Sequence, residues 1–406
     1  MSTVGVPHYD VDLFTDEVLR DPYPHLRTIR ELGPVVWLDA HGVFAATRYA
    51  EVRAILDDHA TFVSGQGVGL NDIVNTLGRR TTLMSDGEEH RSQREIIGRP
   101  LTPRALADLR SDAQAIADAL VERLIPQRRF DAVRDLAEVL PATWVPDLLG
   151  WPEAGRDHLL EWAAANFDGL GPLNDRAVAA GDGMAAMSAY AADLAASALP
   201  EHCFGARIQR AAERGEIDPS RCPMLFIDYL APSLDTTISA IGNALWLFAR
   251  HPDQWQLLRR EPHRVKAALN EVLRLESPIS CFTRVAARDV TIGGVDLAAG
   301  SRVMVSFASA NRDDRRWEDP ERFDITRESA GHLAFGHGAH ACVGMGLARL
   351  EGAAVLTALV ERVSAIELDG PPERKLNNLI RSFGSLPVAV TAAGRASDGV
   401  IAHGER

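Results

Sequence analysis

The sequence predicts a mainly α-helical protein with a minor β region, formed by one domain over residues 1–406. Several long stretches rich in Ala, Leu, Glu and Arg carry apolar residues at intervals of three and four, the period of an amphipathic helix. Strand signals are few, short and bounded by turn residues. No internal repeat, low-complexity block or flexible linker divides the chain, so separate domains are not expected.

The expected elements follow from these patterns. Helices are predicted at residues 104–124, 156–166, 178–197, 223–250, 262–275 and 345–363. Strands are predicted at residues 35–38, 43–46, 290–292, 303–305 and 386–390. The first two strands flank a turn-like Ala-His-Gly segment, so they are expected to form a hairpin.

The helix predicted at residues 223–250 is the most unusual. Apolar residues surround most of its axis, so it is expected to be central and buried. Two acids, Asp228 and Asp235, nevertheless lie within it, and burying a carboxylate without partners is costly. Pro232 cannot donate a hydrogen bond to the carbonyl of Asp228, so the helix is expected to open or kink there.

The charge and the termini exclude several classes of function. The chain has 43 basic and 56 acidic residues, a net charge of −13, so its field repels nucleic acids and anionic lipid surfaces. Neither a signal peptide nor an apolar stretch of bilayer-spanning length is found, which predicts a soluble, cytoplasmic protein without membrane contact. The spacing of the four cysteines fits neither a zinc site nor a disulfide framework, so any functional cysteine acts alone.

Cys342 is the candidate, because it lies in a glycine-rich turn directly before the helix predicted from residue 345. Backbone N–H groups and the positive end of the helix dipole would stabilise a thiolate there. Gly336, Gly338 and Gly344 permit tight turns and the close approach of a flat ligand. A buried structural cysteine is the plain alternative. A nucleophilic cysteine is another, although no activating base is identifiable.

The loop sequence FGHGAHACVG, residues 335–344, resembles the haem-binding loop of the cytochrome P450 family. The resemblance extends from residue 21 to residue 387 and implies the cytochrome P450 fold, a helical bundle around haem b with a long central helix. Within the family, the chain is similar to the soluble bacterial enzymes that oxidise para-substituted benzoates, often by O-demethylation. The similar stretches are residues 67–70, 311–313 and 377–378.

The resemblance also implies which residues bind the cofactor. Cys342 corresponds to the axial iron ligand, and thiolate donation favours cleavage of the O–O bond. The cofactor-binding residues are expected to be His90, Arg94, Arg284, Phe335, Gly336 and His340. His90 and Arg94 lie four residues apart on one helix face, which suits a shared anion, although a solvated basic face is the alternative.

A Glu-x-x-Arg pair, Glu271 and Arg274, precedes Arg322 in the chain. Alone, such a pair is a common surface feature that contributes little to stability. In this order it resembles the family's Glu–Arg–Arg network, so these three residues are expected to support the fold.

The segment at residues 231–237 resembles the family's oxygen-activation motif. Asp235 and Thr236 are expected to relay protons to bound dioxygen, with the Ser233 hydroxyl joining the network. Pro232 and Ser233 stand where the family usually has small residues. An ordinary Thr bonded to its own helix and a buried Asp ion pair are the alternatives.

The substrate pocket departs from the benzoate-oxidising branch. Asp228 and Ala231 occupy the positions expected for serines, and an ionised Asp228 would repel a benzoate. A small aromatic substrate with a hydroxyl or amine group, which Asp228 could bind, is therefore preferred. The alternative is that Asp228 does not contact the substrate and instead pairs with Arg80 or faces solvent. The further expected substrate contacts are Arg80, Met84, Phe167, Leu170 and Phe282.

These features predict a haem-thiolate monooxygenase that uses dioxygen to hydroxylate or O-demethylate its substrate. Electrons are expected from a separate iron–sulfur ferredoxin and its ferredoxin reductase. Their docking face could involve Arg91, Arg99, Arg104 and Arg349, or these arginines could form an ordinary solvated face. A peroxide-driven peroxygenase or isomerase of the same fold, and a non-catalytic haem sensor, are the alternatives.

Overall fold

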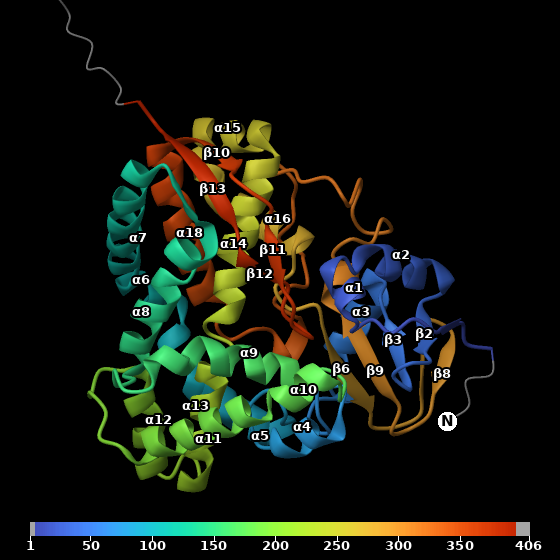
Figure 1. The fold of residues 1–406 in the computed structure, drawn as a ribbon. Coiled ribbons are helices and arrows are strands. Elements are labelled where there is room, and N and C mark those ends of the chain that lie inside the picture. Colours follow the sequence, from blue (N-terminus) through green and yellow to red (C-terminus); the bar gives the residue numbers. More distant parts are fainter. Residues whose placement is uncertain (1–4, 395–406) are drawn as a thin grey trace, which may run out of the picture.

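The computed structural model describes residues 5–394 of the chain. Figure 1 shows a large helical region beside a smaller region that holds most of the strands, near the N-terminus. The prediction of a mainly α protein with a minor β region is confirmed. None of the helices in residues 5–394 is both long enough and apolar enough to cross a bilayer.

The smaller region is built on a six-stranded mixed sheet. Its strands are β1 (His8–Tyr9), β2 (Val35–Leu38), β3 (Val43–Ala46), β4 (Phe62–Val63), β6 (Cys281–Ala286) and β9 (Arg302–Ser306). They are ordered β1-β2-β3-β9-β6-β4. β2 and β3 form the predicted antiparallel hairpin, in which Val35 lies opposite Ala46. β3 pairs with β9 in parallel, so segments distant in the sequence meet in one sheet.

Short helices flank this sheet and longer ones form the helical region. The helices of the first part of the chain are α1 (Asp16–Arg20), α2 (Tyr23–Leu32), α3 (Tyr49–Asp57), α4 (Asp72–Leu77), α5 (Gly87–Gly98), α6 (Pro103–Asp108), α7 (Arg110–Leu124) and α8 (Val139–Leu149). The helix predicted at residues 104–124 is thus interrupted near Leu109, whose N–H bonds to the carbonyl of Leu106.

The remaining helices belong to the second part of the chain. They are α9 (Leu159–Gly169), α10 (Asp175–Ala179), α11 (Gly181–Ala196), α12 (Phe204–Glu213), α13 (Cys222–Leu230), α14 (Asp235–Arg250), α15 (Pro252–Arg260), α16 (Val265–Leu275), α17 (Phe307–Ala310) and α18 (Met345–Arg362). The helices predicted at residues 156–166, 178–197, 262–275 and 345–363 correspond to α9, α11, α16 and α18, with shifted ends.

Smaller sheets complete the fold. One sheet has three strands, in the order β10 (Val363–Leu368), β13 (Pro387–Ala392) and β5 (Arg129–Asp131). β11 (Glu373–Lys375) pairs with β12 (Ser382–Ser385), and β7 (Val290–Ile292) pairs with β8 (Val295–Leu297). The strands predicted at residues 290–292, 303–305 and 386–390 therefore correspond to β7, β9 and β13.

The helix predicted at residues 223–250 is two helices, α13 and α14, separated by residues 231–234. Pro232 lacks the N–H that would bond to the carbonyl of Asp228, and the Ser233 hydroxyl instead donates to the carbonyl of Tyr229. Helical bonding resumes when the N–H groups of Thr237 and Ile238 bond to the Leu234 carbonyl. The prediction of one continuous helix is therefore wrong, while the expected opening at Pro232 is found.

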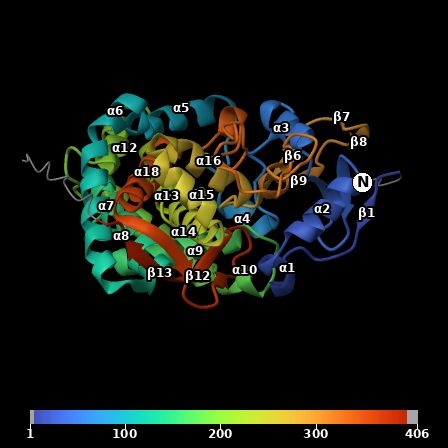
Figure 2. The ribbon, with the colours of Figure 1, turned by 90° about the horizontal axis from the view of Figure 1, so that it is seen from above.

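The α14 helix is the centre of the helical region. It packs against α16, α18, β10 and β12, and Figure 2 shows α16, α18 and β12 around it. Ala244, Leu245 and Phe248 on α14 are completely buried. This burial on several sides explains why the segment is apolar around most of its axis.

A buried ion-pair network joins α16 to the segment that follows α17. Glu271 and Arg274 have no exposed side-chain surface and form two hydrogen bonds of 2.8 and 2.9 Å. The second arginine is Arg327, whose Nε donates to Glu271 over 3.1 Å. Arg322, the residue predicted for this role, has a side chain that is 63% exposed and lies 3.8 Å from Asp324. The assignment of Arg322 is therefore wrong, because only its backbone carbonyl reaches the network.

Replacing Arg327 with Gln should lower the free energy of unfolding by about 3 kcal/mol, because it leaves part of the buried Glu271 charge unpaired. Arg322→Gln is the matched control and should change it by no more than about 0.5 kcal/mol, as expected for an exposed pair. Chemical denaturation of both variants measures the difference. Equal losses in the two variants would contradict this assignment.

Candidate active site

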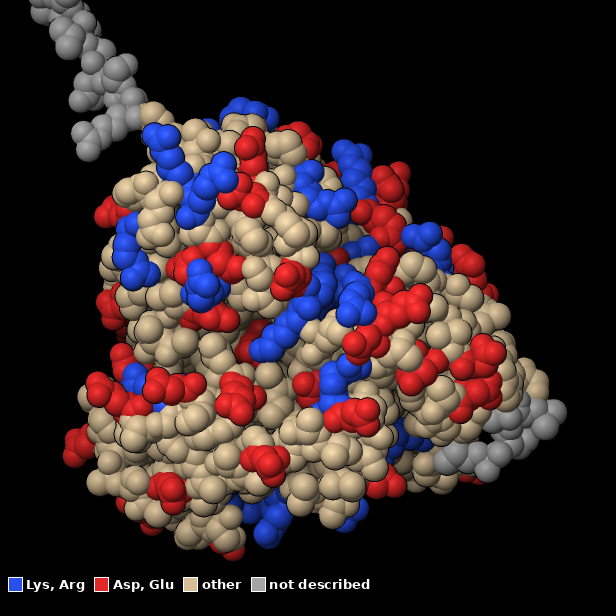
Figure 3. Space-filling view, in the orientation of Figure 1, with Lys and Arg blue, Asp and Glu red and all other residues tan. Residues whose placement is uncertain are grey.

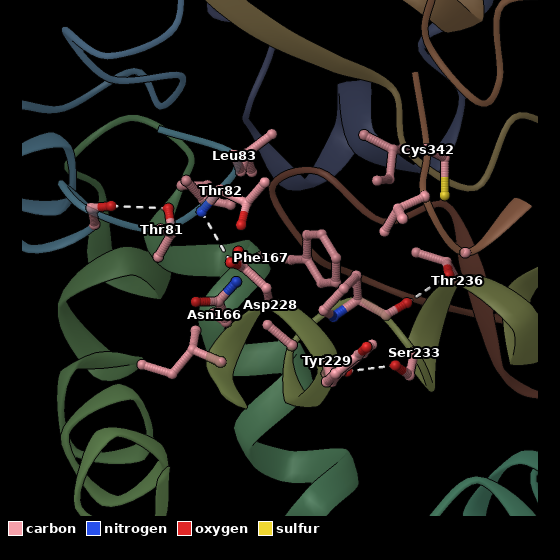
Figure 4. A pocket seen from close by; sticks show the side chains of 18 of the residues that line it. Thr81, Thr82, Leu83, Asn166, Phe167, Asp228, Tyr229, Ser233, Thr236 and Cys342 are labelled. Atoms are coloured by element: carbon pink, nitrogen blue, oxygen red, sulfur yellow. Dashed lines mark hydrogen bonds between the residues drawn. The ribbon is translucent and has the colours of Figure 1, made fainter. Parts of the chain in front are cut away.

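A cavity of about 930 Å³ lies between the interrupted central helix and the loop that carries Cys342. Figure 4 shows Cys342 and Thr236 toward one end of the view and Thr82, Asp228 and Asn166 toward the other. Most of the wall between these ends is apolar, so the cavity has a sulfur at one end and polar groups at the other. The predicted apolar contacts Met84, Phe167, Leu170, Ala231 and Phe282 all line it.

The conformation of the Cys342 loop depends on glycine. Gly336 and Gly338 have φ values of 67° and 68°, in the left-handed region. A Cβ atom on Gly338 would lie 2.4 Å from the carbonyl oxygen of Leu56, so the loop can pack against α3 only with glycine at this position. The N–H of Cys342 then bonds to the carbonyl of Phe335 over 2.8 Å, and α18 begins three residues later.

The sulfur of Cys342 lines the cavity but is enclosed by protein on its other sides. Burial raises the pKa of the thiol, whereas the backbone N–H groups of Gly344 and Met345 and the charge of Arg94 act in the opposite direction. The thiolate predicted from the helix dipole is therefore only partly stabilised by the protein. A cation at the cavity side of the sulfur would complete its stabilisation.

Basic side chains gather beside the sulfur. They are His90 and Arg94 of α5, Arg284 of β6 and His340 of the cysteine loop, and all four line the cavity. The imidazole rings of His90 and His340 lie 4.1 Å apart between centroids. Burial and the neighbouring charges of His340 and Arg94 lower the pKa of His90 to about 4.

These basic groups have few acidic partners within residues 5–394. Asp86, the nearest carboxylate, lies 3.8 Å from His340 and also accepts the N–H groups of Ser64 and Gly65. Burial lowers the pKa of Arg284 to about 10, and the Nε2 atom of His90 is buried without a hydrogen-bond partner. Such an arrangement is suited to a bound anion, which would restore the charged forms.

The interruption between α13 and α14 brings two hydroxyl groups to the cavity. Ser233 and Thr236 both line it, and the Thr236 hydroxyl donates to the carbonyl of Pro232 over 2.7 Å. Asp235, predicted to act with them, is not among the lining residues. Its Oδ2 lies 3.8 Å from Nζ of Lys375 on β11. The structure thus places the predicted alcohol groups at the cavity and the predicted acid behind them.

Asp228 lies at the polar end of the cavity, where its Oδ2 accepts the N–H of Thr82 over 2.8 Å. Burial raises the pKa of this carboxyl to about 6, although the N–H groups of Thr82 and Leu83 and the charge of Arg221 oppose the shift. Neither a pairing with Arg80 nor a solvent-facing carboxylate is found. Arg80, predicted to bind substrate, is exposed and does not line the cavity.

The polar lining residues that were not predicted include Asn166 and Glu351. Asn166 of α9 lines the same cavity as Asp228, and Figure 4 draws both toward the same end of the view. Glu351 of α18 is 1% exposed, and burial raises its pKa well above the usual value for a glutamate. The signal that could have identified Glu351 is the one used for Asp228, an acid within an otherwise apolar helix face. Asn166 has no comparable signal, because an amide near a helix end is common.

Comparisons with known proteins agree with this geometry. A family profile described as cytochrome P450 matches residues 207–388. The chain is 41% identical over 394 residues to cytochrome P450 CYP199A2 of Rhodopseudomonas palustris, with 96% of each chain covered. It is 32% identical over 403 residues to the cytochrome P450 monooxygenase PikC of Streptomyces venezuelae, with 95% of each chain covered.

A solved structure, cytochrome P450 CREJ in complex with (4-ethylphenyl) dihydrogen phosphate, is 27% identical and has a TM-score of 0.83. The comparison covers 96% of this chain and 100% of that one. Cytochromes P450 bind haem b. The cavity fits such a group, because it combines a thiol, a glycine-shaped wall and basic side chains suited to propionates, among which Nε2 of His90 is buried without a hydrogen-bond partner in residues 5–394. The chain therefore belongs to the cytochrome P450 family of oxidoreductases.

Proposed function

We propose that this cytochrome P450 is a monooxygenase that hydroxylates or O-demethylates a small aromatic substrate carrying a hydroxyl or amine group. The observation that carries the substrate class is the Asp228 carboxyl group at the polar end of a mostly apolar cavity. A carboxylate offers about four acceptor sites, so the N–H of Thr82 leaves others for a ligand. Asn166, which lines the same cavity, could hold the same polar group of the substrate.

The ligand held in the CREJ structure is a para-substituted aromatic with one polar end, which supports the shape of the proposed substrate. Its phosphate is anionic, so the charge preference proposed here rests on Asp228 alone. In this chain, the ring would lie among Met84, Phe167 and Leu170, whose apolar surfaces exclude water. A negative charge on the substrate would lie close to Asp228, and this argues against the benzoates used by the branch that the sequence resembles.

The other residues of the cavity then take separate tasks. When bound, haem b with the Cys342 thiolate supplies dioxygen activation and O–O cleavage. His90, Arg94, Arg284 and His340 would hold the propionates, with the loop from Phe335 and Gly336 against the ring. The Thr236 hydroxyl donates a hydrogen bond to the Pro232 carbonyl, and its oxygen keeps lone pairs free to accept another. Thr236 can therefore receive a proton and pass one on.

Electrons would come from a ferredoxin and its reductase, as expected from the sequence. The four arginines expected to form the docking face do not present four free charges. Arg91 pairs with Glu88, and Arg99 pairs with Glu95 and Glu216. Arg349 is half-buried and donates a hydrogen bond to Asn270. Of the four arginines, only Arg104 is exposed and has no ion pair with another residue of the range 5–394. A docking surface made of these arginines is therefore weaker than expected.

The assignment of Cys342 is tested by Cys342→Ser. The haem-loaded variant should lose the red-shifted absorbance of the ferrous–carbonyl complex that is typical of sulfur ligation. Cys281→Ser is the matched control, because Cys281 is a buried cysteine that does not line the cavity. A Cys342→Ser protein that keeps the red-shifted band would exclude this residue as the ligand.

The role of Asp228 predicts opposite pH effects for two ligand classes. Its pKa of about 6 means that the carboxyl is mostly protonated near pH 5 and mostly ionised near pH 7. The affinity for benzylammonium, whose alkylammonium group stays protonated over this interval, should therefore rise about tenfold, while that for a benzoate should fall. Substrate-induced spectral shifts measure both affinities.

Asp228→Asn is the control for this experiment, because it keeps the size of the side chain but cannot ionise. Both pH dependences should disappear in this variant. If benzoates bind the unmodified protein more tightly than phenols and aromatic amines at neutral pH, Asp228 does not set the substrate class.

The interruption at residues 231–234 keeps the peroxide-driven alternative open, because it changes the region that the family uses for oxygen activation. Pro232→Ala restores an N–H that can bond to the carbonyl of Asp228 and should make the helix more continuous. We expect a larger fraction of the electrons to appear as hydrogen peroxide instead of product, because the opening that admits water closes.

The ratio of product to hydrogen peroxide measures this effect, with turnover driven first by donor proteins and then by added peroxide. Pro252→Ala is the control, since Pro252 begins α15 without interrupting it. Unchanged coupling in Pro232→Ala would show that the proline has no part in oxygen activation. Faster turnover with peroxide than with donor proteins would favour the peroxygenase.

A further inference from the structure

Asp235 begins α14 next to the cavity, yet its carboxyl group is directed elsewhere. It is 5% exposed and, unlike Ser233 and Thr236, does not line the cavity. Its Oδ2 is buried and has no hydrogen-bond partner within residues 5–394. A buried carboxylate without a donor is costly, so the nearest cation has a strong influence on its charge and orientation.

That cation is Lys375, which reaches Asp235 from β11. The Nζ atom lies 3.8 Å from Oδ2 of Asp235, and the lysine side chain is 39% exposed. Lys375 therefore contacts solvent and the buried carboxyl group at the same time. Figure 3 shows basic side chains gathered near the centre of this face, where Figure 1 draws β11 and β12.

The choice of lysine at this position is unusual for the chain. Only two of its 43 basic residues are lysines, Lys266 and Lys375. Near Lys375, Arg374 and Arg381 bind the buried carboxylate of Glu276 through hydrogen bonds of 3.0 and 2.9 Å. The contact between Lys375 and Asp235 is longer, and a flexible lysine has no rigid fork of donors to hold a carboxylate in place. Lys375 can therefore orient the carboxyl group of Asp235 through a single charge contact, without the short hydrogen bonds that Arg374 and Arg381 make with Glu276.

The charge of Lys375 also influences two more acids, Asp168 and Glu138. Burial raises the pKa of Asp168 to about 6 and also raises the pKa of Glu138, and in both cases Lys375 opposes the shift while Asp235 adds to it. Asp168 lies on α9 and Glu138 directly precedes α8. Three carboxyl groups around one ammonium would be strongly negative if all were ionised. Burial likewise raises the pKa of Asp235, and Lys375 is the group that opposes this shift.

We propose that Lys375 is a positioning residue that holds the Asp235 carboxyl toward solvent and keeps it ionised, so that Asp235 can take up protons for transfer toward Thr236. Each turnover of a monooxygenase consumes protons as well as electrons, and this arrangement supplies the protons from solvent while the donor proteins supply the electrons. The inference rests on the proposed function, because only an enzyme that reduces dioxygen needs this delivery.

The test compares Lys375→Met, Lys375→Arg and Lys266→Met in the haem-loaded protein. Lys266 is the matched control, since it is exposed on α16. Carboxyl ¹³C NMR follows the titration of Asp235, with Asp235→Asn used to assign its signal. Lys375→Met should raise the titration midpoint by at least about one pH unit, a tenfold change in the ratio of protonated to ionised carboxyl. Lys375→Arg should keep the midpoint near its original value, and Lys266→Met should not change it.

A second measurement separates positioning from a general structural effect. The ratio of product to hydrogen peroxide, followed against pH, should shift in Lys375→Met in the direction of the NMR midpoint and be restored by Lys375→Arg. Lys375→Met should have no additional effect in the Asp235→Asn background. An unchanged Asp235 titration in Lys375→Met, or equal losses with and without Asp235, would overturn the proposal.

This experiment also separates failure of the proposal from failure of the proposed function. If no aromatic ligand is bound or converted, the proposed substrate class is wrong. The NMR titration needs neither substrate nor turnover, so it still decides whether Lys375 controls the charge of Asp235.

Discussion

The cost of burying charge at the Cys342 end of the cavity is the constraint on which the rest of the site depends. The sulfur is enclosed by protein, and burial disfavours its thiolate despite the N–H groups at the start of α18. Nearby, His90 and Arg284 are basic groups with too few acidic partners among the described residues. A bound haem would stabilise both kinds of charge. Its iron would stabilise the thiolate, and its anionic propionates would stabilise the basic side chains. The loop geometry serves this end, since Gly338 allows the close packing against α3 that places the sulfur.

The interruption of the central helix gives its two acids different surroundings. Asp228 lies before the break and lines the cavity, where the N–H of Thr82 holds it. Asp235 lies after the break and contacts Lys375 on the opposite side. In a regular helix, residues seven apart lie on nearly the same face. The loss of regular helical geometry around Pro232 therefore allows Asp228 to face the cavity and Asp235 to face Lys375.

The predictions that succeeded rest on local signals, and those that failed required knowledge of long-range packing. The hairpin of β2 and β3 and most of the helices were predictable, because side-chain periodicity and turn residues act over a few positions. The pairing of Glu271 with Arg274 is local as well, as the two are three residues apart. Their second arginine could not be identified from its spacing, since both Arg322 and Arg327 are near enough in the chain. Packing of the intervening segment buries Arg327 and leaves Arg322 exposed.

By itself, the sequence determined the mainly helical fold, the glycine-rich turn around Cys342 and the opening at Pro232, because each depends on the conformational limits of neighbouring residues. Only the tertiary structure decided what the buried acids contact. Whether Asp228 lies next to Arg80 or to the backbone of Thr82, and whether Asp235 reaches Lys375, depends on how segments far apart in the chain come together. The charge of a buried group depends on all of its neighbours in space, and a linear pattern contains only those nearby in the chain.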